Sequence, residues 1–85
     1  MNEQTIKTLL EAGMPGSQVQ VQGDGRHFEI IVVSEAFAGK TMVQEQKMVY
    51  AVLNEAITRG ELHAVMIKAY TPDEWSGVKD LQVLR

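Results

Sequence analysis

The feature that most constrains the fold is a long segment between two β-prone runs. Residues 28–33 and 62–70 are rich in β-branched and other apolar side chains, as buried strands are. Between them, apolar residues recur at three- and four-residue steps over residues 41–59, and Gly60 provides a natural helix end. Because a helical crossover normally returns the chain parallel to the strand it left, the two runs are predicted to be neighbouring parallel strands.

Shorter signals predict the elements before this crossover. Apolar residues at helical spacing indicate a first helix over residues 3–12, and the alternation in QVQVQ indicates a half-buried strand over residues 18–22. The Asp-Gly pair that follows suits a tight hairpin turn, so this strand is predicted to pair antiparallel with the next one. Residues 34–40 are predicted to form a turn or a single helical loop whose Phe37 lies under the sheet.

The last helix has a clear start signal. Thr71 at the cap, Pro72 at the first helical position and Glu74 at the third form a capping box. This helix carries Trp75, and residues 79–85 are a tail whose order the pattern leaves undefined.

Together these elements predict a single small α+β domain over residues 1–78, followed by the tail at 79–85. The order is helix, strand, strand, helix, strand, helix, which gives a three-stranded mixed sheet with helices on one face. The hydrophobic content of 45% is enough for one core. Because both parallel strands are apolar on both sides, an uncovered sheet face would favour association with a partner or with a second copy.

Composition excludes several functions. The chain has no cysteine, which rules out disulfides, thiol catalysis and thiolate ligation by this chain alone, and which fits a cytoplasmic protein. The net charge of -3 disfavours non-specific attraction to nucleic acid or anionic lipid. With no apolar run of about 18 residues and a polar, acidic N-terminus, neither a membrane span nor a signal peptide is expected.

The two histidines are predicted to lie at one edge of the sheet. His27 opens one parallel strand and His63 opens the other, and neighbouring strands are only about 5 Å apart. Two readings remain open at this stage. Histidines at strand ends often bond to a backbone group or meet solvent, whereas two imidazoles can also serve one metal site. Since a closed zinc site needs four protein ligands, a metal here would take further ligands from another molecule.

The runs GDGRHFEIIVVSEAFAGKTMVQEQKMVYAVL and LHAVMIKAYTPDEW resemble the BolA family, in particular its IbaG-like branch, over roughly residues 19–75. The resemblance implies a class II KH-like fold with the element order derived above. It also implies a role with a monothiol CGFS glutaredoxin, with which BolA-like proteins hold a bridged two-iron two-sulfur cluster for iron-sulfur trafficking or iron sensing. The glutaredoxin cysteine and glutathione supply the thiolates, so no cluster is expected in the isolated chain.

The resemblance assigns the histidine ligand to His63, in LHAVMIKAYTP. In relatives, a second ligand comes from the loop between the first two strands as cysteine or histidine, but here that loop is GDGR and contains neither. His27, which matches the histidine of the family's HF pattern, is the nearest imidazole. The alternatives are ligation by Asp24, weak binding, or a complex without a cluster.

Two other functions are less consistent with the sequence. Related proteins have been regarded as transcriptional regulators, and KH domains clamp nucleic acid with a GxxG loop between two helices. Here the GMPG at residues 13–16 precedes a strand, contains a proline and has no basic cluster beside it, which indicates a helix stop. An enzyme is disfavoured, because Asp73 and Glu74 are explained by the helix start and no nucleophile or phosphate-binding motif is present.

Overall fold

The computed structural model describes residues 2–24, 27–62 and 64–83, and of Ala64 and residues 79–83 the backbone only. The elements follow in this order: α1 (Glu3–Gly13), β1 (Gln18–Gly23), β2 (His27–Val33), the 3-10 turn η1 (Glu35–Phe37), α2 (Met42–Thr58), β3 (Ala64–Tyr70) and α3 (Pro72–Val83). This confirms the predicted order. The helix α3 also extends into the segment whose order the sequence left undefined.

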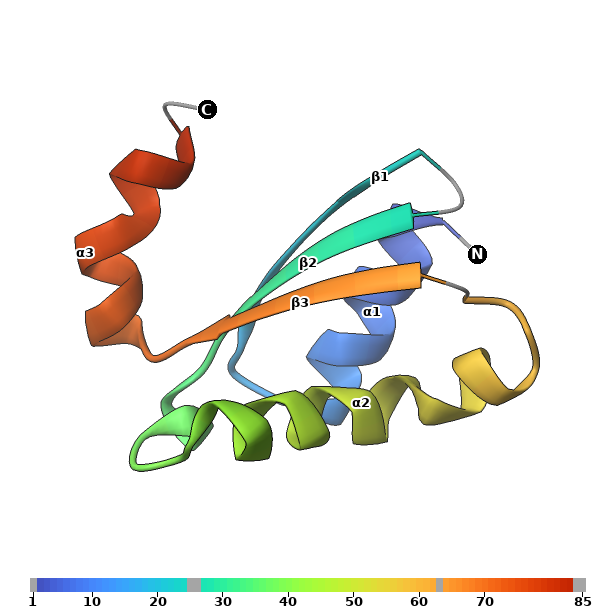
Figure 1. The fold of residues 1–85 in the computed structure, drawn as a ribbon, viewed down its shortest axis with the longest axis horizontal. Helices are drawn as coiled ribbons and strands as arrows, with labels where there is room; N and C mark the ends of the chain where they lie inside the picture. The colour runs from blue at the N-terminus through green and yellow to red at the C-terminus, as the bar shows by residue number, and fades with distance from the viewer. Residues whose placement is uncertain (1, 25–26, 63, 84–85) are drawn as a thin grey trace.

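The three strands form one mixed sheet in the order β1-β2-β3 (Figure 1). β1 and β2 are antiparallel, with Gln18 opposite Val33 and Gly23 opposite Phe28. β2 and β3 are parallel, with His27 opposite Ala64. The parallel pairing predicted from the helical crossover is therefore confirmed.

The main core lies between one face of the sheet and the helices α1 and α2; in Figure 1, α2 runs below the sheet and α1 descends toward it. The sheet contributes alternate residues, whose side chains point to this one face. Phe37 of η1 is only 1% exposed and joins the same core, as predicted. The remaining members from the strands, α1 and α2 are Ile6, Leu10, Val19, Phe28, Ile30, Val32, Val49, Leu53, Ala56 and Ile67.

The third helix packs differently. Trp75 of α3 forms a small second cluster with Ile31 and Val33, whose side chains lie on the face opposite the main core. Its ring centroid is 5.4 Å from that of Tyr70. The expectation of helices on one face thus holds for α1 and α2, whereas α3 covers part of the other face. The physical reason is that β2 is apolar on both sides and needs cover on both.

Side-chain caps set the helix starts. The amide of Glu74 donates to Thr71 Oγ1 at 3.2 Å and the amide of Thr71 donates to Glu74 Oε1 at 2.8 Å, which confirms the predicted capping box. Thr41 and Gln44 make the same reciprocal pair at the start of α2, at 3.2 and 2.8 Å. None of the helices in the described part of the chain has the length and apolar character that crossing a membrane requires.

Candidate functional site

The predicted histidine edge is only partly within the described structure. His27 is the first residue of β2 and lies opposite Ala64, the first residue of β3. His63 immediately precedes Ala64 in the sequence, and its placement lies outside the described residues. The structure therefore confirms that the two parallel strands begin at the same edge, while the position of the second imidazole stays a prediction.

His27 is held by the residue that begins the hairpin turn. Its backbone N–H donates to Asp24 Oδ1 at 2.9 Å, and the Asp24 N–H donates to the His27 carbonyl oxygen at 3.3 Å. The other carboxylate oxygen of Asp24 lies 3.8 Å from His27 Nδ1. These contacts fix the backbone of His27 and set a carboxylate beside one nitrogen of its ring.

At 3.8 Å from Nδ1, and with both side chains exposed, the Asp24 carboxylate is too far for a hydrogen bond to the ring. Because the side chain of His27 is 74% exposed, its ring is accessible to a docked molecule.

Next to His27 the surface is a shallow depression of about 400 Å³. Met66, which is 58% exposed, and Glu29, which forms an ion pair with Lys68 at 3.6 Å, belong to this part of the sheet. Within residues 2–24, 27–62 and 64–83, no three histidine or carboxylate side chains come together as a metal site. A metal at His27 would therefore need ligands from outside the described residues.

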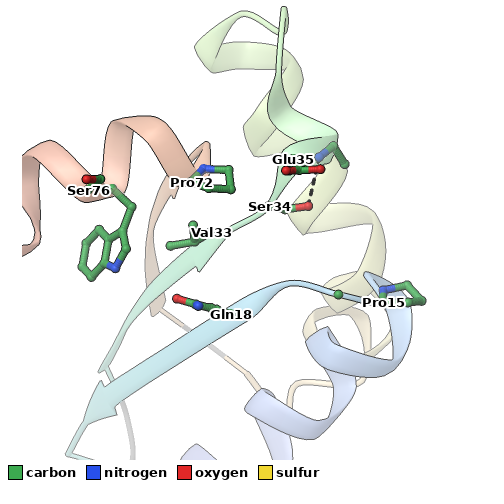
Figure 2. A pocket seen from close by; sticks show the side chains of 10 residues that line it. Pro15, Gln18, Val33, Ser34, Glu35, Pro72 and Ser76 are labelled. Carbon is green, nitrogen blue, oxygen red and sulfur yellow. Dashed lines mark hydrogen bonds between the residues drawn. The ribbon is translucent and has the colours of Figure 1, made fainter.

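A larger depression of about 540 Å³ lies at the opposite end of β2 (Figure 2). Figure 2 shows Pro15, Val33, Glu35, Pro72 and Ser76 around it, with the Ser34 hydroxyl accepting a hydrogen bond from the Ala36 amide at 3.1 Å. The sequence did not indicate this pocket, because it combines the turn after α1, the end of β2 and the first turn of α3. Since β2 begins at His27 and ends at Val33, the pocket is separate from the histidine edge.

The other residues considered as functional have structural roles. The GMPG segment ends α1, with Gly13 as the last helical residue and Gly16 at a φ of 84°, which confirms the helix stop. Glu74 belongs to the capping box. Burial raises the pKa of Glu45 in α2, and the charge of Glu74 raises it further.

Fold and site together define a class of protein: a small α+β domain with a mixed three-stranded sheet and an accessible histidine at the edge where its parallel strands begin. Residues 6–74 match the family model described as BolA-like protein. The chain is also 43% identical, over 76 residues, to Acid stress protein IbaG of Escherichia coli strain K12, which covers 89% of this chain and 90% of that protein. The chain therefore belongs to the BolA-like family, as its sequence pattern indicated.

Solved structures also support membership in the BolA-like family. A BolA protein homologue from Coxiella burnetii superposes with a TM-score of 0.82 at 35% identity, covering 89% of this chain and 97% of that one.

A more distant relative is the DNA-binding transcriptional regulator BolA of Escherichia coli strain K12, which is 33% identical over 58 residues. That match covers 68% of this chain and 54% of the regulator.

Proposed function

We propose that this chain is a non-enzymatic partner of a monothiol CGFS glutaredoxin, and that the two proteins share a bridged two-iron two-sulfur cluster in iron-sulfur trafficking or iron sensing. His63 supplies the main imidazole ligand, and His27 is the weaker second candidate. The observation that carries the proposal is the parallel register of β2 and β3. It pairs His27 with Ala64, the residue that follows His63 in the chain, and adjacent strands are about 5 Å apart.

The donor set of the chain fits a shared cluster better than a cluster of its own. Imidazole is an accepted ligand of iron-sulfur clusters, but this chain has two histidines and no cysteine. The thiolates must therefore come from the glutaredoxin cysteine and from glutathione. Because these thiols have to stay reduced, we place the protein in the cytoplasm.

The contacts of His27 support a ligand role but leave it secondary. The exposed ring of His27 can meet a docked protein, and the Asp24 contacts hold its backbone in place. However, His27 corresponds to the histidine of the family's HF pattern, whereas the second ligand of relatives comes from the hairpin loop. We therefore expect loss of His27 to weaken the shared cluster less than loss of His63.

The test is reconstitution of the complex from the full chain, a CGFS glutaredoxin, iron, sulfide and glutathione. Absorption and circular dichroism spectra report the cluster ligands, and titration of one protein with the other reports the affinity. His63→Ala is expected to change the spectra strongly and to weaken the complex, and His27→Ala to have a smaller effect. Gln22→Ala is a matched control, since Gln22 lines the same depression and is exposed but is no cluster ligand.

Unchanged spectra together with unchanged affinity in His63→Ala would overturn the assignment of the ligand. A second outcome bears on His27. If His27→Ala and Gln22→Ala give the same spectra, His27 is not a ligand, and the imidazole contribution comes from His63 alone.

A nucleic-acid-binding regulator is the second candidate, because of the 58-residue match to the DNA-binding transcriptional regulator BolA. The net charge of -3 counts against it, since phosphate contacts need a local excess of Lys and Arg. The measurement that separates the two functions is binding to DNA and RNA over a range of salt concentrations. Binding that weakens steeply with salt would support the regulator, and negligible binding at low salt would exclude it.

A further inference from the structure

The outer edge of β1 has no neighbour in the part of the chain that the structure describes. β1 is the first strand in the sheet order and pairs only with β2 there. No other backbone or side-chain group in that part hydrogen-bonds to the outward backbone groups of β1. The opposite edge is partly covered, because the Gln46 side chain donates to the carbonyl oxygen of Ile67 in β3 at 2.9 Å.

The hairpin identifies which residues face outward. The Asp24 amide donates to the His27 carbonyl oxygen, so Asp24 and His27 are the hydrogen-bonded pair closest to the turn. Hydrogen-bonded and non-hydrogen-bonded pairs alternate along an antiparallel ladder. The even-numbered residues of β1 therefore direct their N–H and C=O groups to β2, and the odd-numbered residues direct theirs outward: Val19, Val21 and Gly23.

This edge lacks the usual protection against pairing. Proteins commonly place lysine, other charged residues or proline on exposed edge strands, and β1 has none of these in QVQVQG. The alternation of glutamine and valine in β1 also reads almost the same in both directions, so two copies can pair antiparallel with like residues opposite each other. In an antiparallel pair of two copies, glutamine can face glutamine while the valines stay on the helix-covered side.

We propose that the edge of β1 binds the same edge of a second copy of this chain, as an antiparallel pair centred on Val21. In this register Val21 pairs with Val21 of the partner subunit, and Val19 pairs with Gly23 of the partner subunit. All six outward N–H and C=O groups of each strand are then bonded, and the two sheets join into one sheet of six strands. Gln20 faces Gln22 of the partner subunit on the outer side.

The strip beside the strand carries charges of both signs. Glu3, Gln4 and Lys7 of α1 line a depression of about 360 Å³ with residues 19–22 of β1. A twofold axis through Val21 brings this strip of one copy, with one negative and one positive side chain, against the same strip of the other. The half-buried side chain of Val21 is covered as well.

The predicted dimer is weak. A six-residue strand spans about 20 Å, so strand pairing with a few flanking side chains gives an interface at the low end of the range for specific complexes. Dimers should therefore form and dissociate with concentration. The proposal is independent of the proposed role with glutaredoxin, because it needs neither the cluster nor a histidine.

The test compares two double variants by analytical ultracentrifugation from micromolar concentrations to about 1 mM. Gln20→Lys with Gln22→Lys sets like charges directly opposite each other across the new pair. Gln20→Lys with Gln22→Glu sets opposite charges there. Because both glutamines are exposed, neither variant disturbs the core, and thermal unfolding followed by circular dichroism verifies this.

We expect the wild-type chain to dimerise, the Lys/Lys variant to associate roughly tenfold more weakly or not at all, and the Lys/Glu variant to keep the dimer. A wild-type chain that stays monomeric up to the highest concentration overturns the proposal. Equal association of the two double variants overturns it too, because a dimer formed through another surface would not distinguish them.

Discussion

Gly13, at the end of α1, is packed directly against α2. A Cβ atom added at this glycine would lie 2.7 and 2.9 Å from the two Cγ atoms of Val52 and 3.4 Å from its Cβ. Both methyl groups belong to a β-branched residue in a helix, where one χ1 rotamer dominates. Val52 cannot turn both away, so we expect Gly13→Ala to push the two helices apart.

The expected magnitude is a balance of two effects. Alanine is favoured over glycine in a helix by up to about 1 kcal/mol, and overpacking a well-filled contact costs about 1–3 kcal/mol. Gly13→Ala should therefore lower the free energy of unfolding by about 1 kcal/mol. In a domain of this size, that loss corresponds to a Tm about 4–8 °C lower.

A double-mutant cycle separates the steric effect from the propensity effect. Val52→Ala removes both close methyl groups and leaves only the 3.4 Å contact, which is ordinary van der Waals distance. In that background Gly13→Ala should become neutral or stabilising, with a coupling free energy of about 1–2 kcal/mol measured by urea unfolding. Gly77→Ala is the control, since a Cβ at Gly77 in α3 meets nothing within 4 Å. The reasoning fails if Gly13→Ala stabilises the protein as Gly77→Ala does, or if the coupling is below about 0.5 kcal/mol.

Two further predictions concern α2. Thr41→Ala removes the acceptor for the Gln44 amide and should lower the free energy of unfolding by about 1 kcal/mol, as measured by urea unfolding. Burial, and then the charge of Glu74, raise the pKa of Glu45 above its ordinary value of 4.5. The ionised form of Glu45 therefore destabilises the folded state. The free energy of unfolding should increase as the pH falls through the raised pKa. Glu45→Gln should thus increase the free energy of unfolding at neutral pH, with the gain disappearing well below pH 4.5; a gain that persists in acid would contradict this explanation.

Local signals and one topological rule were enough to predict most of the fold. The alternation of QVQVQ, the capping box of Thr71 and Glu74 and the aromatic Phe37 each depend on the residues nearby, and each was placed correctly. The parallel pairing of β2 and β3 followed from the helical crossover. These features are encoded in short stretches, so they can be recognised before any long-range contact is known.

Two features that depend on contacts between distant segments were not predicted. The apolar pattern of β2 shows that both of its faces need cover, but not that Trp75 covers the outer one. The large pocket beside Glu35 joins three separate segments and has no sequence pattern of its own. Thr41 and Gln44 did carry a signal, since their T-x-x-Q spacing is that of a capping box, and this signal was missed. In the candidate site, the structure gives the position of His27 at the start of β2. The position and role of His63 stay predictions.

The uneven cover of the outer sheet face bears on where a partner docks. Around the end of β2, Trp75 shelters Ile31 and Val33, which are nearly buried. Around its beginning no helix does so within the part of the chain that the structure describes, and Met66 remains exposed in the depression that also contains His27. Burying apolar area is the main driving force for protein association, and on this face that area lies beside the imidazole. A glutaredoxin docking as proposed would bury Met66 and shield the ligating ring from water with the same contact. This supports placing the partner surface and the ligand at one end of the sheet.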